Sequence, residues 1–278
     1  MSPILSEETS EPSGDHHLTS SSTSLSAATR APLTDFGRPS FARLTLVELR
    51  KTLDTRAGRW LLVVILLMAA AGLGYRVMNA ADTTVSYEQF YGTALTAVQQ
   101  VLPLLGVLAM TGEWTQRTAL VTFTLVPQRG RVLTAKLVAS MLLTVAMTVL
   151  IGAASAAAAA LGGVLTDSPV LWGDVSERTV GAAASFAVSM LMGAAIGALL
   201  QQTPAALAVY FVAPALIVTV AGELLDEAVR WVDVYAAIGR ISELDLGGGA
   251  LPTASALVLW IGLPLLAGIL RSMRREVQ

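Results

Sequence analysis

Long runs of uncharged residues alternate with short polar intervals over most of the chain. A helix needs about 20 consecutive apolar residues to cross the hydrocarbon core of a bilayer. The longest run has 44 uncharged residues between Arg178 and Glu223, about 66 Å of helix, so we expect it to fold back at "QQTP", residues 201–204. The pattern predicts six spans within a transmembrane domain over residues 60–278, at about 60–81, 89–110, 137–161, 180–200, 205–222 and 253–270.

The segment before the first span has two parts. Residues 1–40 contain fifteen Ser or Thr and no apolar period, which predicts a disordered tail. Over residues 41–59 an apolar stripe at helical spacing predicts an amphipathic helix lying in the membrane interface, and a solvated lead-in to the first span is the alternative. The stripe is Leu46, Leu49, Leu53, Ala57 and Trp60, and the charged positions off it are Arg43, Arg50, Lys51 and Asp54.

The interval before the last span, residues 223–249, is too long for a turn and is not polar throughout. Its apolar residues recur every three or four positions, which predicts an amphipathic helix or helical pair at the membrane surface. A lid over an exit path and an interfacial connector both fit this pattern. The stripe consists of Leu224, Ala228, Trp231, Tyr235 and Ile238.

The composition is typical of a membrane protein and excludes sites that depend on Cys. Hydrophobic residues make up 54% of the chain and charged residues 14%, with a mean hydropathy of +0.65. The chain has no Cys, and its two His residues, His16 and His17, lie in the tail. The lack of Cys excludes Cys-ligated zinc and thiol catalysis, and no other His or Cys could complete a metal site with the His pair. No metal site, no catalytic residue and no nucleic-acid partner are expected in this chain.

Basic residues are distributed unevenly among the polar intervals, and this predicts the orientation. Twelve Lys or Arg fall on one side of the six spans and four on the other. Because cytoplasmic loops carry the excess of Lys and Arg, both termini are expected in the cytoplasm of a multi-pass cell-membrane protein. The twelve are Arg43, Arg50, Lys51, Arg56, Arg59, Arg117, Arg129, Arg131, Lys136, Arg271, Arg274 and Arg275, and the four are Arg76, Arg178, Arg230 and Arg240.

The fourth span has a small residue at every fourth position. Residues four apart share one face of a helix, so this span presents a groove that another backbone can approach closely. The predicted packing face consists of Gly181, Ser185, Ser189, Gly193 and Gly197.

Two glutamines are the most polar residues deep in a predicted span. Gln99 and Gln100 lie one turn before Pro103 in the second span. They are candidates for a substrate path, but hydrogen bonding to a neighbouring helix is the favoured interpretation, because amide side chains commonly join membrane helices.

No predicted span holds a charged residue near its centre, where ion-coupled pumps normally need one. Energy for uphill transport would therefore come from outside the membrane domain.

The polar interval "GEWTQRTALVTFTLVPQRGR", residues 112–131, joins the second and third spans. Its first fifteen residues, Gly112 to Val126, fit a short helix that Pro127 ends. Glu113 lies near the start of this helix, where an acid suits the positive end of the helix dipole. The positive-inside pattern accounts for bases here but not for an acid. Glu113 with Arg117 therefore indicates a further role.

These features together resemble the permease subunits of the ABC-2 family of ATP-binding-cassette transporters, in particular the actinobacterial type. The resemblance covers about residues 41–275 and rests on "LTLVELRKTLDTRAGRWLL", the six spans, the helical interval before the last span and the loop "GEWTQRTALVTFTLVPQRGRVLTAK". It implies an all-α membrane protein in which that loop forms a cytoplasmic coupling helix. It also implies a working complex of two permeases, identical or different, with two cytoplasmic ATPases.

The resemblance assigns roles to individual residues of the loop. Glu113, Trp114, Arg117, Thr118 and Phe123 would face the ATPase, Pro127 would close the coupling helix, and Arg129, Arg131 and Lys136 would anchor the return at the headgroups. The chain has no G-x-x-x-x-G-K-[ST] motif. ATP and Mg would therefore be bound by the separate ATPase, and this chain would carry no cofactor.

The expected function is that of an exporter subunit, not an enzyme, moving a hydrophobic or amphipathic substrate. Export is implied by the family likeness alone. One alternative is a membrane anchor or immunity protein without transport. Another, less favoured, is an intramembrane enzyme, which would need acids, His or metal ligands at membrane depth.

Overall fold

The computed structural model describes residues 40–80, 84–115 and 129–274, and in this part of the chain the regular elements are helices. Residues 40–274 belong to one compact unit. The elements are α1 (Phe41–Asp54), α2 (Arg56–Met78), α3 (Tyr87–Gln99), α4 (Pro103–Thr115), α6 (Arg129–Thr166), α7 (Val175–Leu200), α8 (Thr203–Leu225), the 3₁₀ helix η2 (Asp226–Trp231), α9 (Val234–Ser242), α10 (Ala250–Leu257), the π-helix η3 (Val258–Gly262) and α11 (Leu263–Arg274).

Six helical stretches of the described chain are long and apolar enough to cross a membrane, as in a multi-pass membrane protein. Each overlaps one of the six predicted spans. The stretches are Arg56–Met78, Tyr87–Gly112, Gly130–Thr166, Val175–Leu200, Thr203–Leu224 and Ala250–Met273.

Two prolines change the course of their spans. The span predicted over residues 89–110 is two helices, because α3 ends at Gln99 and α4 begins at Pro103. Proline lacks an N–H and fits the first turn of a helix better than its interior. In the last span a π-helix precedes Pro264, and the Leu263 N–H donates to the carbonyl of Val258. Pro214 lies inside α8 without ending it.

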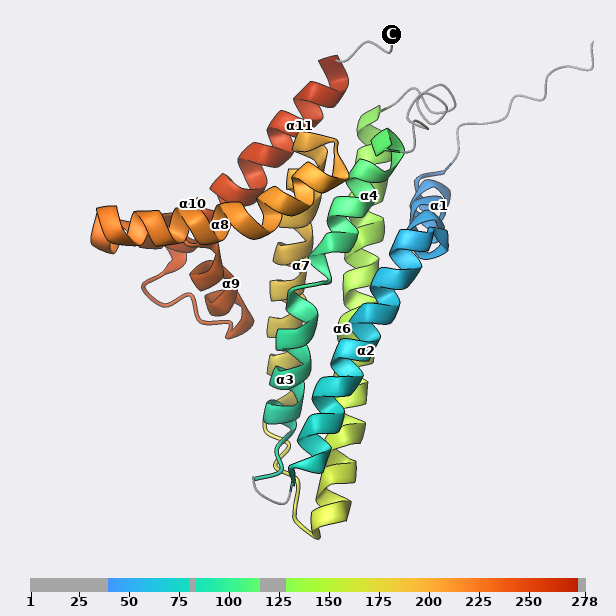
Figure 1. Ribbon diagram of the computed structural model, residues 1–278, viewed down its shortest axis with the longest axis vertical. Coiled ribbons are helices and arrows are strands. Elements are labelled where there is room, and N and C mark those ends of the chain that lie inside the picture. Colours follow the sequence, from blue (N-terminus) through green and yellow to red (C-terminus); the bar gives the residue numbers. More distant parts are fainter. Residues whose placement is uncertain (1–39, 81–83, 116–128, 275–278) are drawn as a thin grey trace, which may run out of the picture. The chain divides into compact units, whose positions relative to one another are not determined.

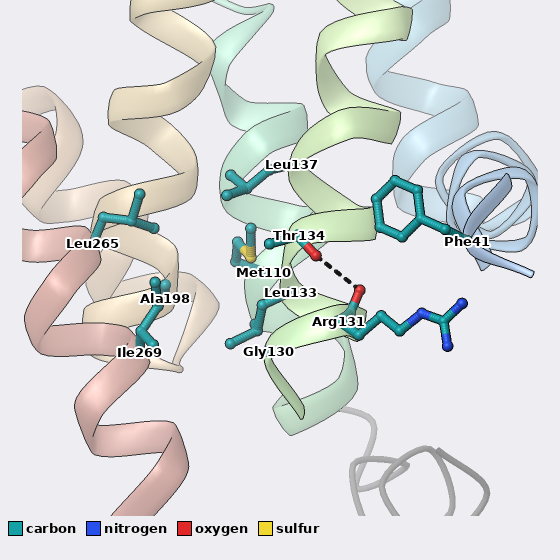
Figure 2. Close-up of a pocket in the computed structure, with 10 residues that line it drawn as sticks. All are labelled: Phe41, Met110, Gly130, Arg131, Leu133, Thr134, Leu137, Ala198, Leu265 and Ile269. Carbon is teal, nitrogen blue, oxygen red and sulfur yellow. Dashed lines mark hydrogen bonds between the residues drawn. The ribbon is translucent and has the colours of Figure 1, made fainter. Parts of the chain in front are cut away.

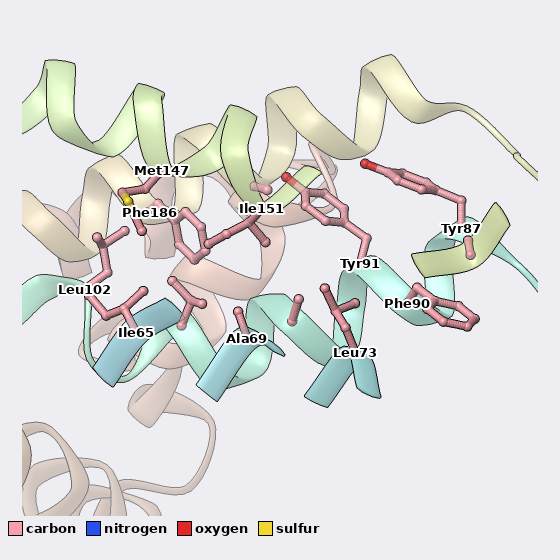
Figure 3. Packing of buried hydrophobic residues seen from close by; sticks show 14 of the residues in the cluster. Ile65, Ala69, Leu73, Tyr87, Phe90, Tyr91, Leu102, Met147, Ile151 and Phe186 are labelled. Atoms are coloured by element: carbon pink, nitrogen blue, oxygen red, sulfur yellow. The ribbon is translucent and has the colours of Figure 1, made fainter. Parts of the chain in front are cut away.

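Helix α7 lies at the centre of the packing. It contacts α3, α4, α6, α8, α9 and α11, and most of its length is buried. One apolar cluster joins α7 to α2, α3 and α6 around Ile65, Tyr91, Leu102 and Phe186, as Figure 3 shows. A second cluster joins it to α4 and η3.

Helix α2, the pair α3 and α4, helix α6 and helix α7 alternate in direction, so two sets of connections lie at opposite ends of α6 and α7 (Figure 1). One end, which we call the basic end, contains α1, the end of α4, the start of α6 and the end of α7. At the other end Arg178 of α7 pairs with Glu88 of α3 at 2.5 Å. There Asp174 caps α7. The Glu177 N–H donates to the Asp174 carboxylate and lowers the pKa of Asp174, and the Ser176 hydroxyl, which also donates to it, lowers that pKa further.

Helix α8 is apolar enough for a span, but it runs crosswise to α6 and α7 in Figure 1. The change of direction occurs close to the predicted turn: Gln201 adopts a left-handed conformation, and α8 begins at Thr203. Few residues of α8 are buried, and Val212 and Leu216 are 59% and 58% exposed. The apolar run therefore predicts the helix but not its direction.

The prediction of one helix over residues 41–59 is wrong, because the chain bends at Thr55. Thr55 caps α2, and its hydroxyl accepts the Gly58 N–H at 3.1 Å. A Cβ at Gly58 would overlap the carbonyl oxygen of Thr52, so the bend needs glycine there. Leu46, Leu53 and Trp60 of the predicted stripe are 57%, 37% and 71% exposed and are available to a bilayer, whereas Leu49 packs against the core.

The interval before the last span is helical, but its predicted stripe is wrong. Trp231 and Tyr235 are 40% and 49% exposed, whereas Val234 and Ala237 are buried against α7. The stripe ran across two helices, η2 and α9, which are separated at residues 232–233. A helical period does not continue through such a break.

The predicted tail over residues 1–40 lies outside the described residues except for Ser40. The Ser40 hydroxyl accepts the Arg43 N–H at 3.3 Å and so caps α1.

Candidate functional site

The candidate site is the basic end, where α1 lies against the first turns of α6. Three polar residues of α1, Thr45, Glu48 and Thr52, recur at helical spacing and point toward the protein. Thr45 and Glu48 are buried. The Thr45 and Thr52 hydroxyls donate to carbonyls one turn earlier on the same helix. Glu48 is therefore the side chain of this face that is available to reach another helix.

A buried ion pair joins the two helices. The Lys136 Nζ of α6 lies 2.5 Å from one carboxylate oxygen of Glu48, and the two side chains are 5% and 9% exposed. The Lys51 ammonium binds the other oxygen at 2.8 Å and is 43% exposed. Removing two charges from water is costly, so such a pair persists only with good geometry and further hydrogen bonds. It fixes the register of α1 on α6.

Lys136 begins a polar ladder along α6. Ser140, Thr144 and Thr148 follow at intervals of four residues and are all buried. Each hydroxyl donates to the backbone carbonyl four residues earlier, at 2.9 to 3.0 Å. The ladder satisfies its own donors, so its burial costs little.

The residues assigned to the coupling loop flank this ion pair in the chain. Glu113 and Trp114 lie in the last turn of α4, and Arg129 begins α6. For these three residues the structure describes the backbone but not the side chain. Arg117, Thr118, Phe123 and Pro127 lie outside the described residues. Arg131 is half-buried and Lys136 is buried. Lys136 thus faces a carboxylate of its own chain, and the expected role at the headgroups does not fit this position.

An apolar cavity of about 480 Å³ opens beside these turns. Figure 2 shows its walls: Leu265 and Ile269 of α11 face Leu133 of α6, and the Arg131 side chain extends away from them. The Thr134 hydroxyl is occupied, since it donates to the Arg131 carbonyl at 3.1 Å. The lining residues are Phe41, Met110, Gly130, Arg131, Leu133, Thr134, Leu137, Ala198, Leu265 and Ile269.

The small-residue face of α7 is filled by helices of the same chain. A Cβ at Gly193 would overlap the carbonyl oxygen of Pro103 in α4, and a Cβ at Gly181 would overlap that of Ser242 in α9. Gly197 lies against Val107 of α4, where a Cβ would come within 3.0 Å of the carbonyl oxygen. Ser185 and Ser189 are buried on the same face. Close backbone approach within the chain accounts for the repeat.

Gln99 forms an interhelical hydrogen bond, and Gln100 does not face the same way. The Gln99 amide nitrogen donates to the Ser189 hydroxyl of α7 at 2.6 Å. Gln100 is exposed, at the break between α3 and α4. The favoured interpretation of Gln99 as a helix-to-helix contact agrees with this geometry, and the idea that these residues line a substrate path stays a prediction.

Sequence reasoning did not identify Glu48 as Lys136's partner. The spacing of Thr45, Glu48 and Thr52 was visible, as was the four-residue repeat that starts at Lys136. Both are signals of polar faces, but 88 positions separate the two charges. Only the packing of α1 against α6 shows that Glu48 and Lys136 form a pair.

In comparisons with known proteins, no family model and no curated protein matches the chain.

Proposed function

We propose that this chain is the permease subunit of an ABC-2 type exporter, which uses ATP hydrolysed by a separate cytoplasmic ATPase. The single observation that carries the proposal is the ion pair between Glu48 and Lys136. It fastens α1 to α6 within eight residues of the point where the chain returns from the proposed docking loop. The loop then has a mechanical connection to the interfacial helix as well as to two candidate spans.

The helices on either side of the loop suit the transmission of force. Helix α6 is 38 residues long, about 57 Å, and reaches from the basic end to the opposite connections (Figure 1). Helix α4 packs against α7 through close backbone contact at Gly193. A displacement of the loop would therefore move α6 as a rigid body and shift α4 relative to α7.

The position of charge supports an external energy source. In the described part of the six candidate spans, charged residues lie toward the helix ends, as with Arg76, Lys136, Arg178 and Arg271. Coupling by protons or ions normally uses a charged group at membrane depth. ATP hydrolysis in a partner subunit fits this distribution better.

The exposed helix surfaces support the proposed substrate class. Apolar side chains cover the accessible faces of α2, α8 and α11, among them Leu67, Val212 and Leu266. A hydrophobic or amphipathic molecule would meet few unsatisfied polar groups on such faces. The proposed working complex contains two permease copies and two ATPases, in the cell membrane with both termini in the cytoplasm.

The docking loop is tested by the double variant Glu113→Ala/Arg117→Ala. The neighbouring genes are first searched for an ATPase with the G-x-x-x-x-G-K-[ST] motif, and the absence of such a gene would count against the proposal. That ATPase is then co-expressed with the permease and reconstituted in proteoliposomes. We expect normal membrane insertion, loss of ATPase co-purification and loss of permease-stimulated ATP hydrolysis.

The matched control is Glu227→Ala/Arg230→Ala, an exposed acid and base in η2. It should keep co-purification and stimulation at the level of the unaltered protein. Unchanged binding and turnover in the loop variant would refute the docking assignment.

A further inference from the structure

Helix α1 presents three distinct faces, and two of them are exposed. The polar face with Glu48 packs on α6. A second flank carries Leu46 and Leu53, which are 57% and 37% exposed. The next flank carries Arg43 and Arg50, seven residues apart and both exposed. An apolar flank beside a basic flank suits the boundary between acyl chains and headgroups.

The exposed charge of this segment is strongly positive. Between residues 40 and 60, all of which the structure describes, the exposed charged residues are Arg43, Arg50, Lys51, Asp54, Arg56 and Arg59. Five of these six are basic. Glu48, the other acid of the segment, is buried and paired with Lys136. The ion pair therefore withdraws a negative charge from the surface and leaves the outward faces with a net charge of about +4.

A hollow of about 360 Å³ lies on this surface, lined by Val47, Arg50, Lys51, Asp54 and Thr55. Two cationic side chains border it, together with one apolar side chain, one carboxylate and one hydroxyl. A phosphate binds well to Arg and Lys, and a headgroup hydroxyl would donate to the Asp54 carboxylate. A headgroup with a phosphate and hydroxyls matches this lining.

Because α1 directly precedes a candidate membrane span, a lipid headgroup is the favoured source of that phosphate. Thr55 is the one residue between α1 and α2, and α2 is long and apolar enough to span a membrane. The hollow is therefore held where a span leaves the bilayer. Clusters of four to eight Lys or Arg at such a place bind anionic lipids.

We propose that α1 is a binding site for anionic phospholipids, with Arg50 and Lys51 at a headgroup phosphate in the hollow, Arg43 two turns away on the same exposed flank as Arg50, and Leu46 and Leu53 among the acyl chains. The site does not depend on the proposed transport function. Lipid binding at α1 is expected whether or not a protein docks at the neighbouring loop.

The test uses the full-length chain purified in a neutral detergent. Its thermal unfolding is followed while dioleoyl phosphatidylglycerol or dioleoyl phosphatidylcholine is added. We expect phosphatidylglycerol to raise the melting temperature at lower concentrations than phosphatidylcholine. The difference should shrink in 1 M NaCl, where the Debye length falls to about 3 Å.

The double variant Arg43→Gln/Arg50→Gln removes two basic groups without touching the ion pair. Each basic residue near an anionic surface contributes enough for about a fivefold change in binding. We expect the phosphatidylglycerol concentration at half effect to rise by about tenfold or more, with no change for phosphatidylcholine. The charge-conserving variant Arg43→Lys/Arg50→Lys should keep the preference.

The matched control is Arg178→Gln/Arg230→Gln, which removes two bases elsewhere and should keep the lipid preference even if its melting temperature falls. The proposal is overturned if the unaltered protein responds equally to both lipids, or if the control loses the preference as fully as the α1 variant. It is also overturned if the lysine variant loses the preference, since the recognition would then depend on something other than charge.

Discussion

Lys136 and Glu48 are an expensive pair for a membrane-embedded helix bundle to bury. Each would cost several kcal/mol to remove from water alone. The cost is offset because both carboxylate oxygens have a cationic partner, Lys136 at 2.5 Å and Lys51 at 2.8 Å. The two lysines differ in burial, since Lys51 is 43% exposed and Lys136 is 5% exposed. Their replacement should therefore have unequal effects.

The variant Lys136→Ala leaves the Glu48 carboxylate buried beside the exposed Lys51 alone. We expect a loss of about 3 kcal/mol in the free energy of unfolding, measured by denaturant unfolding in detergent. Lys51→Ala should cost less than about 1 kcal/mol, because it removes an exposed partner. The pair Glu48→Gln/Lys136→Met should recover most of the loss. Equal losses for the two lysine variants would contradict this account of the site.

The Gln99–Ser189 contact can be separated from a role in a substrate path by a double-mutant cycle. Gln99→Leu and Ser189→Ala each remove one partner of the 2.6 Å hydrogen bond. The coupling energy for unfolding should be about 0.6 kcal/mol, the average for side-chain hydrogen bonds between membrane helices, and at most about 1.7 kcal/mol. A coupling energy near zero would mean that the contact does not hold α3 and α7 together.

At the scale of helices, α7 is organised by backbone proximity. Its small residues let α4 and α9 approach until carbonyl oxygens occupy the space that a methyl group would need. Dispersion contacts accumulate along such a face, and they drive helix association where no hydrophobic effect operates between helices. This face is used within one chain, so the predicted dimer needs another surface.

Gly193→Ala tests the close approach of α7 and α4. A Cβ there would overlap the Pro103 carbonyl, and overpacking of this kind costs about 1 to 3 kcal/mol. Gly222→Ala in α8 is the control, since no atom lies within 4 Å of its Cβ position, and it should stabilise the helix by about 0.5 to 1 kcal/mol. Unfolding in detergent compares the two. Similar effects at both glycines would refute the packing argument.

At the scale of the whole molecule, the ion pairs lie toward opposite ends of the bundle. The helices that carry Glu48, Lys136 and Arg271 come together at the basic end, and Arg271 donates to the Leu199 carbonyl at the end of α7 at 3.0 Å. Glu88 and Arg178 meet at the other end. Both ends carry charged residues, so the excess of Lys and Arg in the polar intervals of the sequence carries the prediction of sidedness.

Sidedness is tested with single cysteines, because the chain has none of its own. Gly130→Cys and Ser168→Cys introduce thiols at exposed positions at opposite ends. A membrane-impermeant maleimide should label the Ser168→Cys variant on intact cells and the Gly130→Cys variant only after permeabilisation. The reverse pattern would invert the proposed orientation.

The helical elements were largely predictable, because a bilayer imposes a simple length and polarity rule on each span. Six candidate spans and a separate helix before them follow from where the charges stop and start. The breaks were less predictable. Thr55 and the turn before Pro103 divide intervals that a hydropathy pattern treats as continuous. Local capping and the missing proline N–H decide such points.

The chain's own pattern of charge and apolarity was enough to indicate a helical membrane protein, the polar ends of its spans and the small-residue face of α7, because these depend on residues close in sequence. The tertiary structure decided that Lys136 meets Glu48, that α4 fills the α7 groove and that α8 turns across its neighbours. Those outcomes depend on which helices become neighbours. Contacts between residues about 90 positions apart follow from the packing of all the helices together, and no local period records them.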